Sequence, residues 1–318
     1  MNNKNKKISI VGVGNVGAII AYTLTIYGIA NEIVLIDTNL NRAKGEAMDI
    51  SQMKPLTHNV NIYAGDYLSV VDSDIIIISA GLKRKPNQVR MDLAKINIGI
   101  VKEIIPQLLK YASNAVFLVV SNPVDIITYA VTKFSGLPYS QIVGSGTILD
   151  TMRLRTSLAE HVSLAPQNIH AYVVGEHGDA SIIPWSLVYI AGIQMERYCE
   201  NNCNQYNICG KSKLQNIIDY VKTSGTKIIA YKGATYYTIS LSVCKLCDSI
   251  LRNDKEIFTV SSMLQGQYGV DNVCASLPFV TNKQGILHAL DISMTEHEIN
   301  EFYNSATAIK DALRLLKI

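Results

Sequence analysis

The sequence predicts an α/β protein with a doubly wound parallel sheet over residues 1–145 and an α+β domain over residues 146–318. Up to about residue 145, apolar runs of strand length alternate with segments of helical period, which is typical of a parallel sheet covered by helices. The first apolar run leads directly into a glycine-rich turn. From residue 146 the pattern changes to one helix, strand pairs and then long helices, so we expect a second domain of different construction.

The first expected strand, residues 7–13, runs into the turn GVGNVG at residues 12–17 and then into an apolar helix over residues 18–27. Glycines let the backbone of such a turn approach a pyrophosphate at the helix N-terminus, where free amides and the helix dipole favour an anion. Strand, glycine turn and helix together predict a Rossmann fold. The turn residues expected to bind a dinucleotide cofactor are Gly12, Gly14, Asn15, Val16 and Gly17.

A second expected strand, residues 32–36, ends at Asp37, twenty residues after Gly17. A carboxylate at this position accepts hydrogen bonds from the adenosine ribose hydroxyls and repels a 2′-phosphate. The sequence therefore predicts NAD rather than NADP as the cofactor. The simpler alternative is a tight turn without a ligand, followed by a solvated Asp37.

Two further apolar runs, residues 74–81 and 115–120, have the length and continuous hydrophobicity of buried parallel strands. Between them lies the polar stretch LKRKPNQVRMDL, followed by a long helical segment. Because doubly wound sheets bind ligands at the carboxyl ends of their strands, we expect this polar stretch to form a lid. At the same edge, Ala80 and Gly81 are expected to border the cofactor, and Asn122 to reach the reacting centre.

Residues 144–179 bring together an acid, arginines and a histidine. Asp150 and Arg153 are three residues apart in an apolar-periodic segment, so both side chains project to one side of a helix. His177 follows in the loop Gly-Glu-His-Gly-Asp, whose glycines allow close approach to a ligand. An imidazole paired with a carboxylate is a general base, and a guanidinium binds a carboxylate in a bidentate manner. In isolation these residues would form a surface ion pair and an ordinary loop histidine, but beside a dinucleotide site they indicate hydride transfer.

The rest of the chain is expected to be largely helical. The polar stretch 196–212, which contains three cysteines, is expected to be a loop or a short surface insertion. Cys244 and Cys247 lie in an apolar helical segment, where cysteine packs as a small hydrophobe, so we expect no structural metal. The expected helices span residues 92–111, 217–231, 236–251 and 295–316, and the last begins with the capping box Thr-Glu-His-Glu.

Composition excludes several classes of function. The 318 residues carry a net charge of only +3, and the basic residues are dispersed, so nucleic acid is not an expected partner. No apolar run approaches the roughly 20 residues that a membrane helix needs, so a membrane is not expected either. The amino-terminal lysines and apolar run imitate a signal peptide, but three glycines and Asn15 interrupt the run. We therefore expect a cytoplasmic protein.

Five motifs resemble one family over nearly the whole chain: the L-lactate/L-malate dehydrogenases, and among them the bacterial L-lactate dehydrogenases. The loop GEHGD in register with LDTMR is the most specific of these motifs. The resemblance implies that the second domain is a catalytic, substrate-binding α+β domain and that the reaction belongs to glycolysis and fermentation. The matching motifs are GVGNVG (12–17), SNPVDIITY (121–129), GSGTILDTMRLR (144–155), APQNIHAYVVGEHGD (165–179) and KGATYY (232–237).

The resemblance also implies a role for each polar residue of the site. His177 would accept and donate the proton while Asp150 orients it, and Arg153 would clamp the substrate carboxylate. Arg90, in the lid, would polarise the substrate carbonyl, and Asn122 would donate a hydrogen bond nearby.

The identity of the 2-hydroxy acid depends on two conflicting positions. Most lactate enzymes of the family carry Gln-Lys-Pro-Gly in the lid, whereas this chain has Arg84 at the first of these positions, which is the usual mark of malate enzymes. Thr235 resembles the lactate enzymes, and Ile239, one turn further on, would press on the nicotinamide. Because the rest of the match is lactate-like, we favour pyruvate and L-lactate, with oxaloacetate and malate as the alternative.

Two properties beyond the reaction are implied by resemblance alone. Arg155 and His170 match positions that bind fructose 1,6-bisphosphate in allosteric bacterial lactate dehydrogenases, but a solvated arginine and a strand-edge histidine remain an equal alternative. A homo-oligomer is also implied, either a dimer or a homotetramer, of which we favour the homotetramer. A non-catalytic nucleotide-binding relative is the remaining alternative. The chain retains six polar site residues, which argues against that alternative: Asp37, Arg90, Asn122, Asp150, Arg153 and His177.

Overall fold

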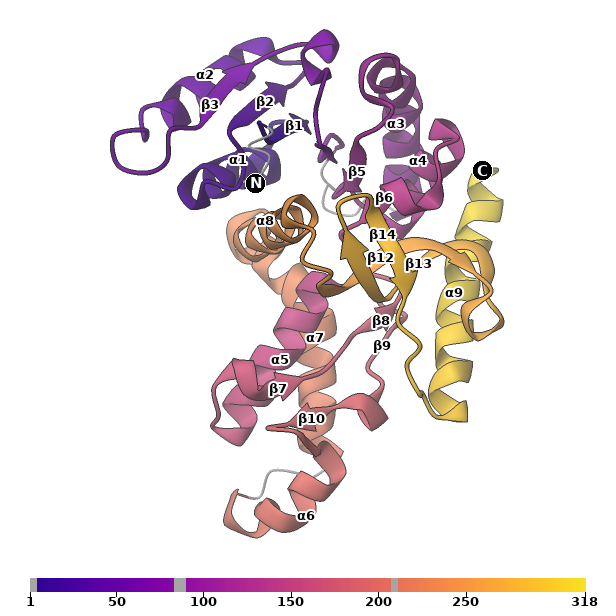
Figure 1. Ribbon diagram of the computed structural model, residues 1–318. Coiled ribbons are helices and arrows are strands. Elements are labelled where there is room, and N and C mark those ends of the chain that lie inside the picture. Colours follow the sequence, from indigo (N-terminus) through magenta and orange to yellow (C-terminus); the bar gives the residue numbers. More distant parts are fainter. Residues whose placement is uncertain (1–4, 83–89, 207–210) are drawn as a thin grey trace.

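The computed structural model describes residues 5–82, 90–206 and 211–318, with backbone only at residue 90 and at residues 203–206 and 211–212. Its first half is a parallel sheet in the order β3-β2-β1-β4-β5-β6 (Figure 1). The strands of this half are β1 (Lys7–Val11), β2 (Glu32–Ile36), β3 (Asn61–Ala64), β4 (Ile75–Ile78), β5 (Val116–Val119) and β6 (Ile142–Gly144). The helices that alternate with them are α1 (Asn15–Tyr27), α2 (Leu40–Ser51), α3 (Arg90–Ala112) and α4 (Val124–Ser135).

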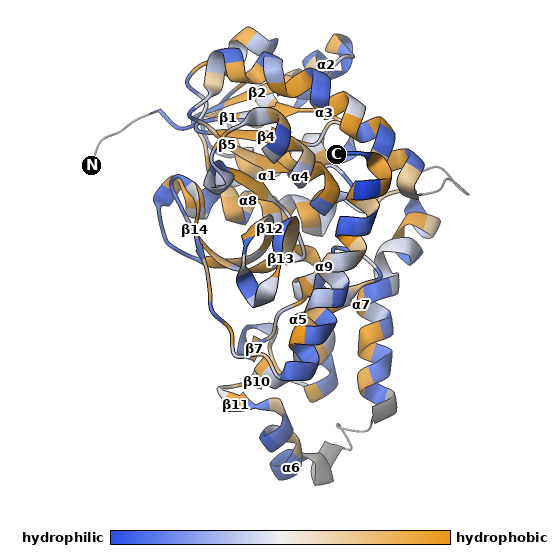
Figure 2. Ribbon diagram, turned by 90° about the vertical axis from the view of Figure 1, so that its right-hand side faces the viewer, coloured by the Kyte–Doolittle hydropathy of each residue, from blue (hydrophilic) through white to orange (hydrophobic). Residues whose placement is uncertain are grey.

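Hydrophobic burial explains why these short segments form strands. The four isoleucines of β4 are all fully buried, because β4 lies between β1 and β5 and helices cover the sheet. β-Branched side chains fit such a pleated surface and lose little additional rotamer freedom there. Figure 2 shows the difference in hydropathy between the buried and the exposed elements, with strongly hydrophobic central strands and a largely polar α2 at the surface.

The sheet does not end where the parallel strands end. β12 (Ile257–Gln265) pairs antiparallel with β6, with Ser261 opposite Gly144, and the sheet continues through β13 (Asp271–Asn282) to β8 (Val174–Gly175) and β9 (Ser181–Ile182). β14 (Gly285–Ala289) pairs with β13. The parallel half and the second half of the chain therefore share one mixed sheet, and the division at residues 145 and 146 remains a prediction.

In its described residues, the second half adds a small three-stranded sheet and five α-helices. The small sheet has the order β11 (Ile193–Gln194), β10 (Tyr189–Ile190) and β7 (Ile169–His170). The helices are α5 (Ile148–Val162), α6 (Met195–Tyr206), α7 (Lys211–Lys232), α8 (Tyr237–Arg252) and α9 (Glu296–Leu316). Short 3-10 turns are found at Tyr67–Val70, Tyr139–Gln141, Pro166–Asn168, Trp185–Leu187 and Gln267–Gly269.

Helix α6 corrects one expectation. Residues 196–212 were expected to form a loop or a short surface insertion, and for the described part of this stretch the prediction of a loop was wrong, because residues 195–206 are helical. Met195 is buried, and Tyr198 and Cys199 pack against the core formed by α5, α7 and the small sheet. A spacing of three and four residues between these side chains gives a helix one apolar face, although its composition is polar overall.

The other helical expectations agree with the structure. The expected capping box opens α9: the Thr295 hydroxyl accepts from the Glu298 amide at 3.3 Å, and the Glu298 carboxylate accepts from the Thr295 amide at 2.8 Å.

Cys244 and Cys247 are buried and free within α8. Among the described residues, no group of three metal-ligating side chains is found. None of the described helices is both long and apolar enough to span a membrane.

Candidate active site

The glycine turn between β1 and α1 is built by close packing. Gly12 has φ +94°, and a β-carbon there would lie 2.4 Å from the backbone nitrogen of Ala80. A β-carbon at Gly17 would lie 2.1 Å from the carbonyl oxygen of Gly12. Side chains at these two positions are therefore incompatible with the turn. Because the positive φ of Gly12 breaks the extended backbone, β1 ends at Val11 and does not continue to Val13 as expected.

The same turn leaves the start of α1 accessible to an anion. Gly14 is the N-cap of α1, and among the described residues no side chain caps this helix. A β-carbon at Gly14 would meet no atom of the described structure within 4 Å. Unpaired first-turn amides beside open space are the donor set that a pyrophosphate requires, so this part of the site fits a dinucleotide.

Asp37 lies at the end of β2, directly beside the turn. One carboxylate oxygen accepts from the amide of Val13 at 2.6 Å, and the other accepts from the amide of Asn39 at 2.8 Å. These hydrogen bonds hold a negative charge next to the glycine turn. Ala80, at the end of β4, is held in turn by the Ser121 hydroxyl, which donates to its carbonyl at 2.6 Å.

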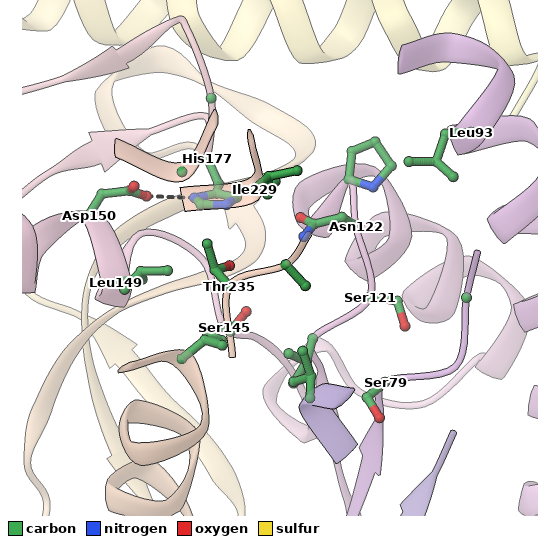
Figure 3. Close-up of a pocket in the computed structure, with 18 of the residues that line it drawn as sticks. Ser79, Leu93, Ser121, Asn122, Ser145, Leu149, Asp150, His177, Ile229 and Thr235 are labelled. Atoms are coloured by element: carbon green, nitrogen blue, oxygen red, sulfur yellow. Dashed lines mark hydrogen bonds and ion pairs between the residues drawn. The ribbon is translucent and has the colours of Figure 1, made fainter. Parts of the chain in front are cut away.

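A cavity of about 420 Å³ runs from this turn to the carboxyl ends of β4 and β5 and on to α5 and α7. Asn15, Val16 and Gly81 line its cofactor side together with Ile239 of α8. Asn122, His177 and Thr235 line its other side, and their side chains point toward one another from three separate segments (Figure 3). The cavity thus connects the residues expected to bind the cofactor with those expected to react.

The polar centre of the cavity is an arginine–aspartate–histidine cluster. One oxygen of Asp150 accepts from Nη1 of Arg153 at 2.9 Å. The other lies 2.5 Å from Nδ1 of His177, the contact drawn as a dashed line in Figure 3. Asp150 and Arg153 project from the first two turns of α5, and His177 reaches them from the loop between β8 and β9. The hydrogen bond at Nδ1 leaves Nε2 as the ring nitrogen that can exchange a proton with a ligand.

Burial and charge act in opposite directions on this cluster. Burial disfavours the ionised carboxyl of Asp150, but the charges of His177 and Arg153 and their hydrogen bonds outweigh it and lower the pKa of Asp150. Burial likewise disfavours the imidazolium, but the carboxylate of Asp150 outweighs it and raises the pKa of His177 above its ordinary value. The cluster is therefore suited to holding a proton on His177 near neutral pH.

Sequence reasoning missed Asn97, a buried amide that connects two edges of the cavity. Its Nδ2 donates to the carbonyl of Asn122 at 2.7 Å, and its Oδ1 accepts from the amide of Leu82 at 2.8 Å. Asn97 is only 1% exposed and lies on the buried face of α3 beside Ala94 and Ile98. A polar residue in the apolar row of a helix is the signal that could have identified it.

The two halves of the chain match two family models. Residues 6–144 match the lactate/malate dehydrogenase NAD binding domain, and residues 147–317 match the lactate/malate dehydrogenase alpha/beta C-terminal domain. The chain belongs to the lactate/malate dehydrogenase family. It is accordingly an NAD-dependent dehydrogenase, in agreement with the glycine turn and Asp37.

Individual relatives cover almost all of this dehydrogenase. The L-lactate dehydrogenase of Thermoanaerobacter sp. (strain X514) is 47% identical over 98% of this chain and 99% of its own length. That of Acetivibrio thermocellus is 44% identical over the full length of both chains. The crystal structure of a minor L-lactate dehydrogenase from Enterococcus mundtii superposes with a TM-score of 0.93 at 36% identity, covering 98% of each chain. MGS-M5, a lactate dehydrogenase from a deep-sea metagenome library, gives 0.94 at 32% identity, covering 99% of each chain.

Two of the expected site residues are not described in this dehydrogenase. Arg84 lies among residues 83–89, outside the described residues. Arg90 is the first residue of α3, but its side chain is also outside what the structure describes. The expected contributions of the lid to substrate binding and carbonyl polarisation therefore remain predictions.

Arg155 and His170 lie on neighbouring elements of this dehydrogenase, α5 and β7, and neither residue is among those that line the cavity. Nε of Arg155 donates to the carbonyl of Ala171 at 3.1 Å, and its guanidinium lies 5.8 Å from the ring centre of Tyr172. Burial lowers the pKa of Arg155. His170 is exposed, opposite Tyr189 of β10. These contacts describe the positions without assigning them a ligand.

Proposed function

We propose that this dehydrogenase is an L-lactate dehydrogenase that interconverts pyruvate and L-lactate. The cluster of Arg153, Asp150 and His177 in a cavity that reaches the NAD site is the observation that carries the proposal. The relatives at 42–47% identity are named L-lactate dehydrogenases, which supports the same substrate and does not favour malate.

Arg153 binds the substrate carboxylate in this proposal. Its Nη1 is occupied by Asp150 at 2.9 Å, which fixes the plane of the guanidinium and leaves its other edge for the substrate. That edge faces Gly225 of α7, where a β-carbon would lie 3.4 Å from Nη2. The absence of a side chain at Gly225 leaves room for a carboxylate beside Nη2. A bidentate contact of this kind also sets the orientation of the carbon that reacts.

His177 exchanges the proton with the substrate oxygen. When pyruvate is reduced, Nε2 of the imidazolium donates its proton to the carbonyl oxygen, and Asp150 stabilises the positive charge beforehand through Nδ1. When L-lactate is oxidised, the neutral imidazole accepts the hydroxyl proton. A bound nicotinamide cofactor would supply the hydride as NADH when pyruvate is reduced and accept it as oxidised NAD when L-lactate is oxidised. Asn122 and Thr235 face the same space and limit the poses that the substrate can adopt.

Malate remains the second candidate because Arg84 would pair with a second carboxylate. The test is the ratio of kcat/KM for pyruvate to that for oxaloacetate in the wild-type enzyme and in Arg84→Gln. A charged hydrogen bond contributes about 1.5 to 3 kcal/mol, so if Arg84 pairs with oxaloacetate, Arg84→Gln should reduce kcat/KM for oxaloacetate about tenfold to a hundredfold. A wild-type preference for oxaloacetate would overturn the lactate assignment.

We further propose a cytoplasmic homotetramer with fructose 1,6-bisphosphate as its effector, bound by Arg155 and His170. A phosphate between these side chains is held more tightly when the imidazole is protonated, so activation should be stronger at mildly acidic pH. Saturation curves for pyruvate at pH 6, with and without the bisphosphate, test this part. Unchanged curves would refute activation by fructose 1,6-bisphosphate. Light scattering tests the oligomeric state, for which we expect the mass of a homotetramer.

A further inference from the structure

A second carboxyl group, besides that of Asp150, contacts His177. Asp125 lies in the first turn of α4 and is 2% exposed. One of its oxygens, Oδ2, accepts from the backbone amide of His177 at 2.8 Å. The other oxygen, Oδ1, is buried without a hydrogen-bond partner in the part of the chain that the structure describes. The mechanism given above does not use this residue.

The groups that act on Asp125 come from β12, from β13 and from the loop that carries His177. The hydroxyl of Ser261, on β12, stabilises its ionised form, although this hydroxyl also has no hydrogen-bond partner among the described residues. His177 attracts the carboxylate, Glu176 in the same loop repels it, and the thiol of Cys274 faces it from β13. His177 itself faces Asp150 and Arg153 from α5.

A purely structural role does not account for a carboxyl at this position. Holding one backbone amide requires only an acceptor, which the side-chain oxygen of asparagine would supply in the same shape. Burying a charged carboxylate costs more free energy than burying the neutral amide of asparagine. A negative charge is useful here if a positive charge forms next to it, and His177 is the neighbour that gains one.

We propose that Asp125 is a positioning residue for the proposed reaction: it holds the His177 backbone from α4 and provides a second negative charge that favours the imidazolium. This inference rests on the proposed function of His177. Burial raises the pKa of Asp125 to about 6, and the pKa of His177 is itself raised above its ordinary value. Asp125 is therefore ionised in the pH range where His177 titrates, so its charge is present when it is needed.

The test is Asp125→Asn, which keeps an acceptor for the His177 amide and removes only the charge. We expect the pKa that governs kcat/KM for pyruvate to fall by about 1 pH unit, so that activity above that pKa falls about tenfold. Below pH 6, activity should approach that of the wild type. A nuclear magnetic resonance titration of the His177 ring should show the same shift without substrate.

Glu298→Gln is the matched control. Glu298 is another buried carboxylate, 7% exposed, that accepts hydrogen bonds from Ser186 and Thr295 outside the cavity. Its replacement should leave the His177 titration unchanged. If Asp125→Asn titrates like the wild type, the proposal is wrong. If the wild type does not reduce pyruvate, the proposed function fails, while the ring titration still tests Asp125.

A second measurement covers the case in which Asp125→Asn does not fold. In the wild type, the His177 resonances should show a second inflection near pH 6, where Asp125 takes up a proton. Ser261→Ala removes a hydroxyl that stabilises the ionised carboxyl, so it should move this inflection to higher pH. A single inflection in the wild type, unchanged in Ser261→Ala, would overturn the proposal.

Discussion

Replacing Asp150 with asparagine tests the centre of the site. The change removes the charge that lies 2.5 Å from Nδ1 of His177 while keeping the side-chain shape. The raised pKa of His177 depends mainly on this carboxylate, so it should fall to its ordinary value of about 6.5 or below, because burial then acts with less opposition. At pH 7.5, only about one imidazole in ten would then carry the proton that pyruvate reduction requires.

The charged hydrogen bond between Asp150 and His177 is the interaction that raises this pKa, so its loss is counted once. We therefore expect kcat/KM for pyruvate at pH 7.5 to fall about tenfold, and to recover toward pH 5.5.

The assay follows NADH absorbance with pyruvate between pH 5.5 and 9, together with thermal unfolding to confirm that the variant folds. The conservative Asp150→Glu separates charge from geometry, since it keeps the carboxylate and changes only its reach. A folded Asp150→Asn enzyme whose kcat/KM lies within twofold of the wild type over this pH range would refute the role given to Asp150.

Three further predictions concern the turn, the buried amide and the pH dependence of stability. Gly12→Ala places a β-carbon 2.4 Å from the Ala80 nitrogen, so it should lower the melting temperature and weaken NADH binding in a fluorescence titration. The control is Gly45→Ala, in an open position on α2, which should be neutral or stabilising by about 0.5 to 1 kcal/mol. Equal effects of the two substitutions would contradict the packing argument. Asn97→Leu removes two part-buried hydrogen bonds, to the Leu82 amide and the Asn122 carbonyl, and at about 0.5 to 1.5 kcal/mol each should cost about 1 to 3 kcal/mol of stability in urea unfolding, with a loss of kcat/KM that Asn97→Gln does not fully repair; a variant as stable as the wild type would be evidence against this bridge. Because the folded pKa of His177 is raised, its contribution to stability should be complete below pH 6.5 and lost as pH rises through the folded value, so the wild type should lose more stability than His177→Gln between pH 6 and pH 9 in urea unfolding.

The glycine turn and the start of α5 could be anticipated because their signals are local. Gly12 and Gly17 lie in one short motif, and the backbone geometry that excludes a β-carbon is formed largely by residues next to them and by β4. Asp150 and Arg153 are one helical turn apart, so their contact follows from the helix alone. Helix α6 was missed because its polar composition outweighed the spacing of Met195, Tyr198 and Cys199.

What the sequence by itself determined about this protein is therefore its alternating pattern of strands and helices, its glycine turn and the contact between Asp150 and Arg153. Only the tertiary structure decided that β12 pairs with β6, so that both halves share one sheet, and that Asp125 meets the backbone of His177 across 52 residues of chain. It also decided that Asn97 bridges Leu82 and Asn122. The physical reason is that periodicity reports which face of an element is buried, whereas the partner on that face is selected by packing of the whole chain.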